Sequence, residues 1–414
     1  MPEVSEVSHV CALLRRNVLG CQLSKVNLKN DPLLFPVLKG SKDPDEELFR
    51  LRSKLENKVI KSVGRHGKYF WLRLRDNESS ESTVLLMHFG MTGMIKLRNV
   101  KSHLIFMENG GDSVILKELK EEKIKKEVGN QDDKPPSGDG VKREAQSTVD
   151  SQVKEEEITP EKEEEWPPRF SKFELELTRG TDKIDFSFTD PRRLGRVRLL
   201  EGPEIQTDKQ LMDQDPLVQL GPDYSKSPTP VETKDQFTSG DPDPSPHGRP
   251  RLDLEQFSKL VLSKRTPIKS LLLDQRFFAG VGNWMGDEIL YHAKIYPNEV
   301  LGAKIEPESS TGGVHPKIAD LYNALIYVCE YSVLVEGDVR RFPANWLMMY
   351  RWGKRRKSAP KLKTAEGYQV DHITVGGRTA CYVPDIQRPI AAHARAEFSN
   401  TSPEGTPSKK RKRV

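Results

Sequence analysis

The chain has 414 residues, of which 31% are charged and 35% are hydrophobic, and its formal net charge is +5. At roughly 100–200 residues per domain, this length predicts two or three domains, and the modest hydrophobic fraction places part of the chain outside any core. No run approaches the ~18 consecutive apolar residues of a membrane-spanning helix, and the first ten residues contain no apolar signal segment. These features predict a soluble intracellular protein without membrane contact.

The first predicted element is a helix over residues 4–19, because apolar residues recur there near helical spacing and Gly20 follows as a stop. Short runs of alternating, β-branched and aromatic residues come next, and their density predicts a β-sandwich. These runs cover residues 68–74, 83–89, 172–177, 183–188 and 196–200.

An acidic block interrupts these strands at residues 116–165. It holds 10 Lys+Arg and 16 Asp+Glu, a net charge of −6, which leaves +11 for the rest of the chain. With few apolar residues it cannot offset the entropy cost of ordering, so we expect a disordered insertion; an exposed helix over 116–128 is the alternative. The basic remainder favours a polyanionic partner.

Helical patterns follow a linker rich in Pro, Ser, Asp and Gly at residues 222–250. We expect one helix from an Asp253 cap through residue 263 and a second opened by Thr266 and Pro267. A third is expected over 287–293 with Asn283 as its cap, and a fourth over 316–335. A hairpin is expected at residues 372–383, where glycines permit a tight turn.

The segment after residue 390 has the composition of a tail and ends in the basic run Lys409-Lys-Arg-Lys-Arg413. Such a run is typical of a nuclear import signal, so we expect the protein in the nucleus. A solvated tail that makes loose phosphate contacts is the alternative.

The chain starts with Met1-Pro2-Glu3. Removal of the initiator methionine would leave Pro2 as a free secondary amine, and an α-amino group with a pKa of roughly 7.7–8.0 is partly neutral near pH 7. A neutral amine can form an iminium with a sugar aldehyde carbon, and Glu3 is then a candidate general acid/base. Taken alone, this start is better explained by chance, because many proteins begin with Pro and Glu by accident.

Three further motifs could contact nucleic acid. Lys68 follows a glycine turn from which a lysine can reach a phosphate. Met91, Arg192 and Leu194 lie in glycine-containing loops, where exposed side chains could wedge into a base stack. The glycine-rich segment before Asn283 exposes backbone N–H groups to an anion. The first two have bland alternatives, namely a surface turn for Lys68 and core packing for Met91 and Leu194.

Six motifs in chain order together resemble the formamidopyrimidine-DNA glycosylase / endonuclease VIII family. They are Pro2-Glu3-Val-Ser-Glu-Val7, Gly67-Lys68-Tyr69, His88-Phe-Gly-Met-Thr-Gly93, Thr189-Asp-Pro-Arg-Arg-Leu-Gly195, Leu273-Asp-Gln-Arg-Phe-Phe-Ala-Gly-Val-Gly-Asn283 and Gly377-Arg378-Thr379. The resemblance implies an α+β fold, with an N-terminal helix and β-sandwich followed by a helix–two-turn–helix domain. We accordingly expect a catalytic domain over 1–221, a linker over 222–250, a DNA-binding domain over 251–342, a finger hairpin over 343–390 and a tail over 391–414.

The resemblance also implies roles for the motif residues. Pro2 would attack C1′ of the damaged nucleoside, and Glu3 would assist opening of the sugar. Lys68 would hold phosphate and support β-elimination, and Arg378 would grip the phosphate beside the lesion and support δ-elimination.

DNA contacts follow from the same resemblance. Lys264 and Asn283 would contact backbone phosphates, while Met91, Arg192 and Leu194 would fill the gap left by a flipped base. The expected partner is double-stranded DNA with oxidised bases or abasic sites, and the expected products are a released oxidised purine, such as 8-oxoguanine or a formamidopyrimidine, and a nicked strand.

One departure concerns the finger, because many relatives carry a four-cysteine zinc site there. The four cysteines here, Cys11, Cys21, Cys329 and Cys381, include no close pair, and only Cys381 lies in the finger region. The chain therefore resembles the zincless-finger branch that includes plant and fungal enzymes, and we expect no metal or cofactor.

Two functions of other classes remain open at this stage. The chain could be a catalytically silent protein that binds damaged DNA, or a nuclear scaffold that works through its acidic block. Nothing in the sequence indicates an oligomer, so we expect a monomer.

Overall fold

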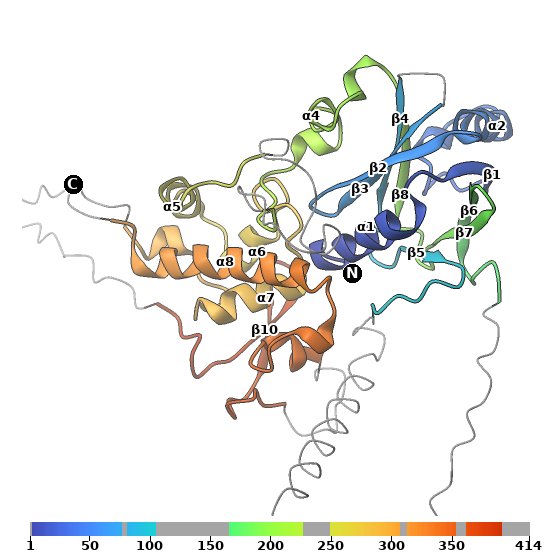
Figure 1. The fold of residues 1–414 in the computed structure, drawn as a ribbon. Helices are drawn as coiled ribbons and strands as arrows, with labels where there is room; N and C mark the ends of the chain where they lie inside the picture. Colours follow the sequence, from blue (N-terminus) through green and yellow to red (C-terminus); the bar gives the residue numbers. More distant parts are fainter. Residues whose placement is uncertain are drawn as a thin grey trace, which may run out of the picture.

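The computed structural model describes residues 2–76, 81–104, 165–226, 249–306, 313–352 and 362–390. Within these ranges an N-terminal part is built around a β-sheet and a second part is built from helices and one hairpin (Figure 1). This arrangement confirms the predicted α+β class. The expected insertion, except Glu165, and the expected tail with its basic run lie outside the described residues.

The N-terminal part begins with α1 (Val4–Val18), which agrees with the predicted first helix. Eight strands follow in this part: β1 (Gln22–Leu28), β2 (Val59–His66), β3 (Tyr69–Arg75), β4 (Ser82–His88), β5 (Met94–Leu97), β6 (Ser171–Arg179), β7 (Asp182–Thr189) and β8 (Arg196–Leu200). The remaining helical segments of this part are η1 (Pro36–Leu38), α2 (Pro44–Leu55), η3 (Pro203–Ile205), α4 (Asp208–Leu211) and η4 (Leu217–Gln219).

Hydrogen bonds join the eight strands into one antiparallel sheet with the order β5-β7-β6-β1-β2-β3-β4-β8. The sheet closes over a shared core, because Phe89, which follows β4, stacks on Phe188 of β7 with ring centroids 5.7 Å apart. β4 and β7 lie near opposite ends of the strand order, so the two halves of the sheet must face each other. The expected sandwich is thus present as one continuous, folded sheet.

Sequence reasoning missed α2, β1, β2 and β5. The signal for α2 was available, because Asp43 precedes Pro44 and its side chain accepts a hydrogen bond from the N–H of Glu46 (3.0 Å). An aspartate cap followed by proline is a common helix start.

The second part contains α5 (Leu254–Ser263), α6 (Ile268–Leu272), α7 (Asn283–His292) and α8 (Pro316–Leu334), and a hairpin of β9 (Asp371–Val375) and β10 (Arg378–Tyr382). Short 3-10 segments connect them: η5 (Leu301–Ala303), η6 (Val339–Arg341) and η7 (Leu347–Met349). α1 contacts both β2 and α8, and Val4 at its start belongs to the core of the second part. The first turn of α1 is therefore held between the two parts of the protein.

Two predicted helix starts were wrong. Pro267 is itself the cap residue of α6 and has no side-chain hydrogen bond, so Thr266 does not cap this helix. α7 begins at Asn283 rather than at Asp287, and Gly282 occupies its cap position. Asn283 cannot cap a helix of which it is the first residue; a carboxylate from the other end of the chain does so instead, as described below.

The first residues of the expected linker pack against the sheet. Asp223 is fully buried, forms an ion pair with Arg65 (2.7 Å) and accepts a hydrogen bond from the N–H of Gly67 (2.9 Å). This contact fixes the turn that precedes Lys68. Apart from 222–226 and 249–250, the expected linker lies outside the described residues.

Candidate active site

The carboxylate of Glu3 lies at the N-terminus of α7. Its Oε1 accepts a hydrogen bond from the N–H of Trp284 (2.9 Å), and its Oε2 accepts one from the N–H of Met285 (3.1 Å). The first N–H groups of a helix have no partner within the helix, and the helix dipole favours negative charge there. The start of the chain is therefore fixed to α7 through Glu3.

Three glycines make this close approach possible. A Cβ on Gly282 would lie 2.2 Å from Cδ of Glu3, and one on Gly280 would lie 2.7 Å from Cβ of Val4. A Cβ on Gly67 would lie 2.9 Å from the main-chain N of Gly280, so the turn before Lys68 meets the same loop. The loop before α7, the chain start and the Lys68 turn thus converge at one point.

Lys68 is almost fully buried, with 9% of its surface exposed. Burial lowers its pKa, the nearby Arg378 guanidinium lowers it further, and the carboxylates of Glu3 and Glu6 act in the opposite direction. Arg378, Glu3 and Glu6 are therefore close enough to influence the charge of Lys68. A lysine with a lowered pKa is suited to proton transfer as well as to phosphate contact.

Glu6 adds a second carboxylate to the site. Its Oε2 accepts hydrogen bonds from the N–H of Glu3 (2.9 Å) and the hydroxyl of Ser5 (2.8 Å), and its Oε1 accepts one from the indole N–H of Trp284 (3.2 Å). Burial raises the pKa of Glu6, and the Glu3 carboxylate raises it further. Glu6 thereby fixes the backbone next to Pro2, which is itself buried.

Arg378 is exposed and is the first residue of β10, directly after a two-residue turn. Gly376 and Gly377 both have positive backbone φ angles, +54 and +76, which residues with a Cβ rarely adopt. The side-chain amide of Asn283 donates to the carbonyl of Thr379 (3.0 Å) and so holds the hairpin against α7. The carbonyl oxygen of the same amide is buried without a hydrogen-bond partner in the described ranges.

Met91 and Leu194 are both exposed, at 36% and 40%, and lie on two turns that touch each other. A Cβ on Gly90 would lie 2.3 Å from the carbonyl oxygen of Leu194. The buried Asp190 joins the turns, because it accepts hydrogen bonds from the hydroxyl of Thr92 (2.7 Å) and from the N–H of Gly195 (2.7 Å). The alternative of core packing for Met91 and Leu194 is wrong.

Arg192 is exposed on the same turn, and its N–H also donates to Asp190 (3.2 Å). Its neighbour Arg193 has a positive φ of 56 and forms an ion pair with Asp31 (2.9 Å). Arg193 is therefore held by Asp31 in the segment after β1, whereas the Arg192 side chain is exposed together with Met91 and Leu194.

Comparison with known proteins identifies the family. Residues 1–197 match the formamidopyrimidine-DNA glycosylase N-terminal domain, and residues 241–333 match the formamidopyrimidine-DNA glycosylase H2TH domain. The chain belongs to the formamidopyrimidine-DNA glycosylase family. The formamidopyrimidine-DNA glycosylase of Arabidopsis thaliana is 27% identical over 388 residues, which cover 94% of this chain and 71% of that relative.

Solved structures share the fold. Lactococcus lactis Fpg in complex with DNA containing an abasic site has a TM-score of 0.55 at 16% identity and covers 93% of this chain and 99% of its own. MutM in complex with DNA containing carbocyclic 8-oxo-G has a TM-score of 0.54 at 17% identity and covers 94% of this chain and all of its own.

Among the described residues, no helix is long and apolar enough to cross a membrane.

Buried charges anchor the segment before the β9–β10 hairpin to α7. Asp287 of α7 accepts hydrogen bonds from Lys269 (2.6 Å) and Arg351 (2.7 Å). Glu288 accepts from the N–H groups of Leu347 (3.0 Å) and Met348 (2.7 Å). All four cysteines, including Cys381 in β10, are buried and free. Ion pairs and main-chain hydrogen bonds to α7 therefore hold the segment before the hairpin.

Lys264 lies apart from the other predicted site residues. Its ammonium group sits 4.5 Å from the ring centroid of Phe277, on the segment that leads toward the glycine loop before α7. No contact in the described ranges joins Lys264 to Glu3, Lys68 or Arg378, so its contact with DNA stays a prediction.

Sequence reasoning missed Glu6, Asp190 and the two adjacent acidic residues of α7, Asp287 and Glu288. Glu6 was within the N-terminal motif, and its spacing of three residues from Glu3 indicated a capping box, which the structure contains. Asp190 was within the motif Thr189–Gly195, and it accepts hydrogen bonds from the N–H groups of Arg192 and Gly195 in the same turn, so a local signal was available. Nothing local marked Asp287, because its partners Lys269 and Arg351 come from other segments of the chain.

Proposed function

We propose that this chain is a bifunctional DNA glycosylase and AP lyase that removes oxidised purines, such as 8-oxoguanine and formamidopyrimidines, from duplex DNA. The observation that carries the proposal is the Glu3 carboxylate, held on the N-terminus of α7 beside Pro2 and within electrostatic reach of Lys68. A terminal amine, a carboxylate and a buried lysine at one point are needed for imine chemistry and are not needed for binding alone.

In the proposed reaction the neutral amine of Pro2 attacks C1′ of the damaged nucleoside. The bond between C1′ and the base breaks, and the base leaves with its bonding pair and takes up a proton. The Glu3 carboxylate takes the proton that the Pro2 nitrogen releases on bonding to C1′ and delivers it to the ring oxygen, so the bond between C1′ and the ring oxygen breaks, the sugar opens and an iminium forms between Pro2 and C1′. The iminium acidifies the C2′ protons, and β-elimination then expels the 3′ phosphate.

The proposal assigns two cations to the elimination steps. Burial lowers the pKa of Lys68, which supports its role in removing the C2′ proton. Arg378 at the hairpin turn binds the phosphate that leaves in a second, δ-elimination. Water hydrolyses the remaining imine and restores the Pro2 amine.

We further propose that the protein opens the duplex with Met91, Arg192 and Leu194, which occupy the gap left by the extruded nucleotide. The joined, exposed turns support this role. The two solved relatives named above hold DNA with an abasic site or an 8-oxoguanine analogue, which supports the same class of partner.

Borohydride trapping tests the proposal, because borohydride reduces an iminium to a stable amine. We expect the untagged protein to form a covalent complex with an 8-oxoguanine or abasic duplex. Pro2→Gly should weaken trapping, and an uncleaved N-terminal tag should abolish it. The surface variant Val37→Ala serves as a control and should trap normally. Normal binding of damaged duplex without trapping or nicking would instead favour a catalytically silent protein that binds damaged DNA.

We also propose that the protein belongs to the zincless-finger branch and acts in the nucleus. The finger region has only Cys381 and is anchored through Asp287 and Glu288, and the basic run at residues 409–413 is typical of an import signal. A fluorescent fusion that remains nuclear after deletion of residues 407–414 would contradict the assigned role of that run.

A further inference from the structure

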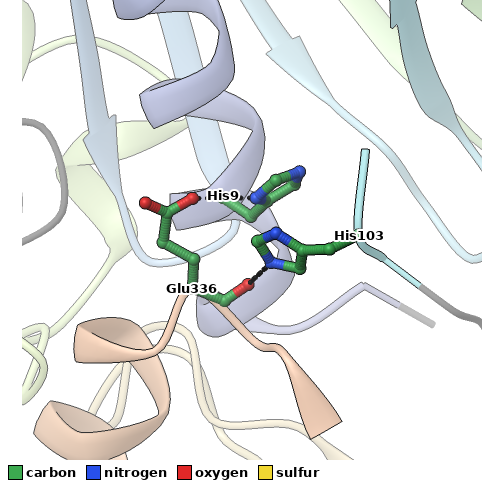
Figure 2. A group of neighbouring side chains, drawn as sticks. All are labelled: His9, His103 and Glu336. Atoms are coloured by element: carbon green, nitrogen blue, oxygen red, sulfur yellow. Dashed lines mark hydrogen bonds and ion pairs between the residues drawn. The ribbon is translucent and has the colours of Figure 1, made fainter. Parts of the chain in front are cut away.

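Three side chains with metal-binding chemistry meet beneath α1, away from the candidate active site. His9 comes from α1, His103 from the segment after β5, and Glu336 from the turn that follows α8 (Figure 2). Their ligand atoms all lie within 4.8 Å of one another. His9 and Glu336 are buried, the two imidazole centroids are 4.0 Å apart, and His103 is partly exposed.

Hydrogen bonds assign the ring nitrogens of His103. Its Nε2 lies 3.0 Å from the main-chain carbonyl oxygen of Glu336, and because a carbonyl only accepts, this nitrogen carries the proton. Nδ1 therefore keeps its lone pair, and Figure 2 shows the other ring nitrogen on the side of His9. No hydrogen bond of this Nδ1 is found in the described part of the protein.

His9 is hydrogen-bonded through both ring nitrogens. Its Nδ1 lies 2.9 Å from Oε2 of Glu336, and because a carboxylate only accepts, Nδ1 carries a proton that an incoming ion would displace. Its Nε2 lies 2.9 Å from the hydroxyl of Ser102, which can donate or accept. Metal-binding histidines typically use one ring nitrogen for the ion and donate the other N–H to an outer oxygen, which fixes the ring. With an ion on both Nδ1 atoms, the Ser102 hydroxyl and the Glu336 carbonyl would be those outer oxygens.

Glu336 is held in an unfavourable backbone conformation and is neutralised by a displaceable cation. Its φ is +52, in the left-handed region that non-glycine residues seldom occupy. Its carboxylate forms an ion pair with Arg16, whose side chain is 32% exposed and can turn into solvent. A metal ion can thus replace the guanidinium without leaving a buried charge unpaired.

We propose that His9, His103 and Glu336 bind one divalent transition-metal ion, best matched by Zn²⁺, with water in the fourth position. Two imidazoles and one carboxylate suit zinc, whose ligand distances are about 2.0–2.2 Å. The site clamps α1 to the turn after α8 and so joins the two parts of the protein. It is independent of the proposed function, because it uses none of the candidate active-site residues.

Titration of the untagged, chelator-treated full chain with Co²⁺, followed by competition with Zn²⁺, tests the site. We expect one equivalent of Co²⁺, with visible d–d bands of a tetrahedral nitrogen and oxygen site that Zn²⁺ abolishes. His103→Ala and Glu336→Gln should each weaken Zn²⁺ binding by roughly tenfold or more, since even outer-sphere changes cost 10–100-fold.

His315→Ala is the matched control. His315 is exposed just before α8, whereas Glu336 lies just beyond its other end, so removing this imidazole should leave the affinity unchanged. Because His103 is only partly buried, its alanine variant should fold, which an unchanged melting temperature of the metal-free protein would show. Absence of stoichiometric binding, equal affinity in His103→Ala, or a Co²⁺ spectrum with thiolate charge-transfer bands would overturn the proposal.

Discussion

The Glu3 contact with α7 is the residue-scale feature from which the site is built. Sequence reasoning identified Glu3, Lys68 and Arg378 as candidates but placed Asn283 as the cap of α7. The structure gives that role to the Glu3 carboxylate, which lies 281 residues away from Trp284 in the chain. Helix-cap rules use adjacent residues, so they could not predict a cap supplied by another segment.

Gly282→Ala tests this contact with little backbone cost, because Gly282 has φ of −123, which alanine readily adopts. The added Cβ would lie 2.2 Å from Cδ of Glu3 and must displace the carboxylate. We expect the turnover of damaged duplex to fall by about tenfold or more while duplex binding changes little. Glu3→Gln, which keeps the side-chain size, is the comparison. Full activity of Gly282→Ala in steady-state cleavage assays would show that the contact between the Glu3 carboxylate and the N-terminus of α7 is dispensable.

The elements of regular period were predictable, whereas those fixed by distant partners were not. α1, α5, α8 and strands β3, β4, β6, β7 and β8 agree with apolar periodicity and caps in the sequence. The finger anchor did not follow from any local pattern, because Asp287 in α7 pairs with Lys269 and with Arg351, which is 64 residues further along the chain.

Asp287→Asn should lower the free energy of unfolding by roughly 3–5 kcal/mol, because Lys269 and Arg351 would be left buried without a counter-charge. Asp274→Asn is the control, since its partner Arg276 is 72% exposed and solvent screens such a surface pair, so the loss of stability should be much smaller. Chemical denaturation of both variants gives the comparison. Equal losses would mean that the buried triad does not anchor the finger.

Substitutions in the two exposed turns should affect contact with DNA and leave the fold intact. Met91→Ala and Leu194→Ala remove side chains that are about one third or more exposed, so stability should change by no more than about 0.5 kcal/mol. If these side chains support an extruded nucleotide, affinity for abasic duplex should fall, and affinity for undamaged duplex should fall less. Fluorescence anisotropy with matched duplexes measures both; an equal decrease would contradict the wedge role.

At the scale of the whole molecule, buried histidines make stability depend on pH. Burial lowers the pKa of His66 to about 4 from an ordinary value of 6.5, with Lys226 adding to the effect. Burial likewise lowers the pKa of His88 to about 4, with Lys68 and Arg196 adding. Between about pH 4 and pH 6.5 the unfolded chain binds more protons than the folded one, so the free energy of unfolding rises with pH.

We therefore expect the protein to keep the full contribution of both histidines above pH 6.5 and to lose it as the pH falls toward 4. The loss is on the order of 3 kcal/mol for each group. His66→Gln, whose amide can still donate to the carbonyl of Gly221, should flatten the dependence in this window. Urea unfolding at a series of pH values measures the slope, and an unchanged slope in the variant would contradict the assignment.

The central claim is that the amine of Pro2 becomes bonded to the deoxyribose of a damaged nucleotide. Peptide mass spectrometry of the borohydride-reduced complex tests it most directly, because it locates the added sugar on the chain. The account predicts a single adduct on the peptide that begins at Pro2 after loss of Met1. An adduct on Lys68 or another lysine, with an unmodified chain start, would contradict it.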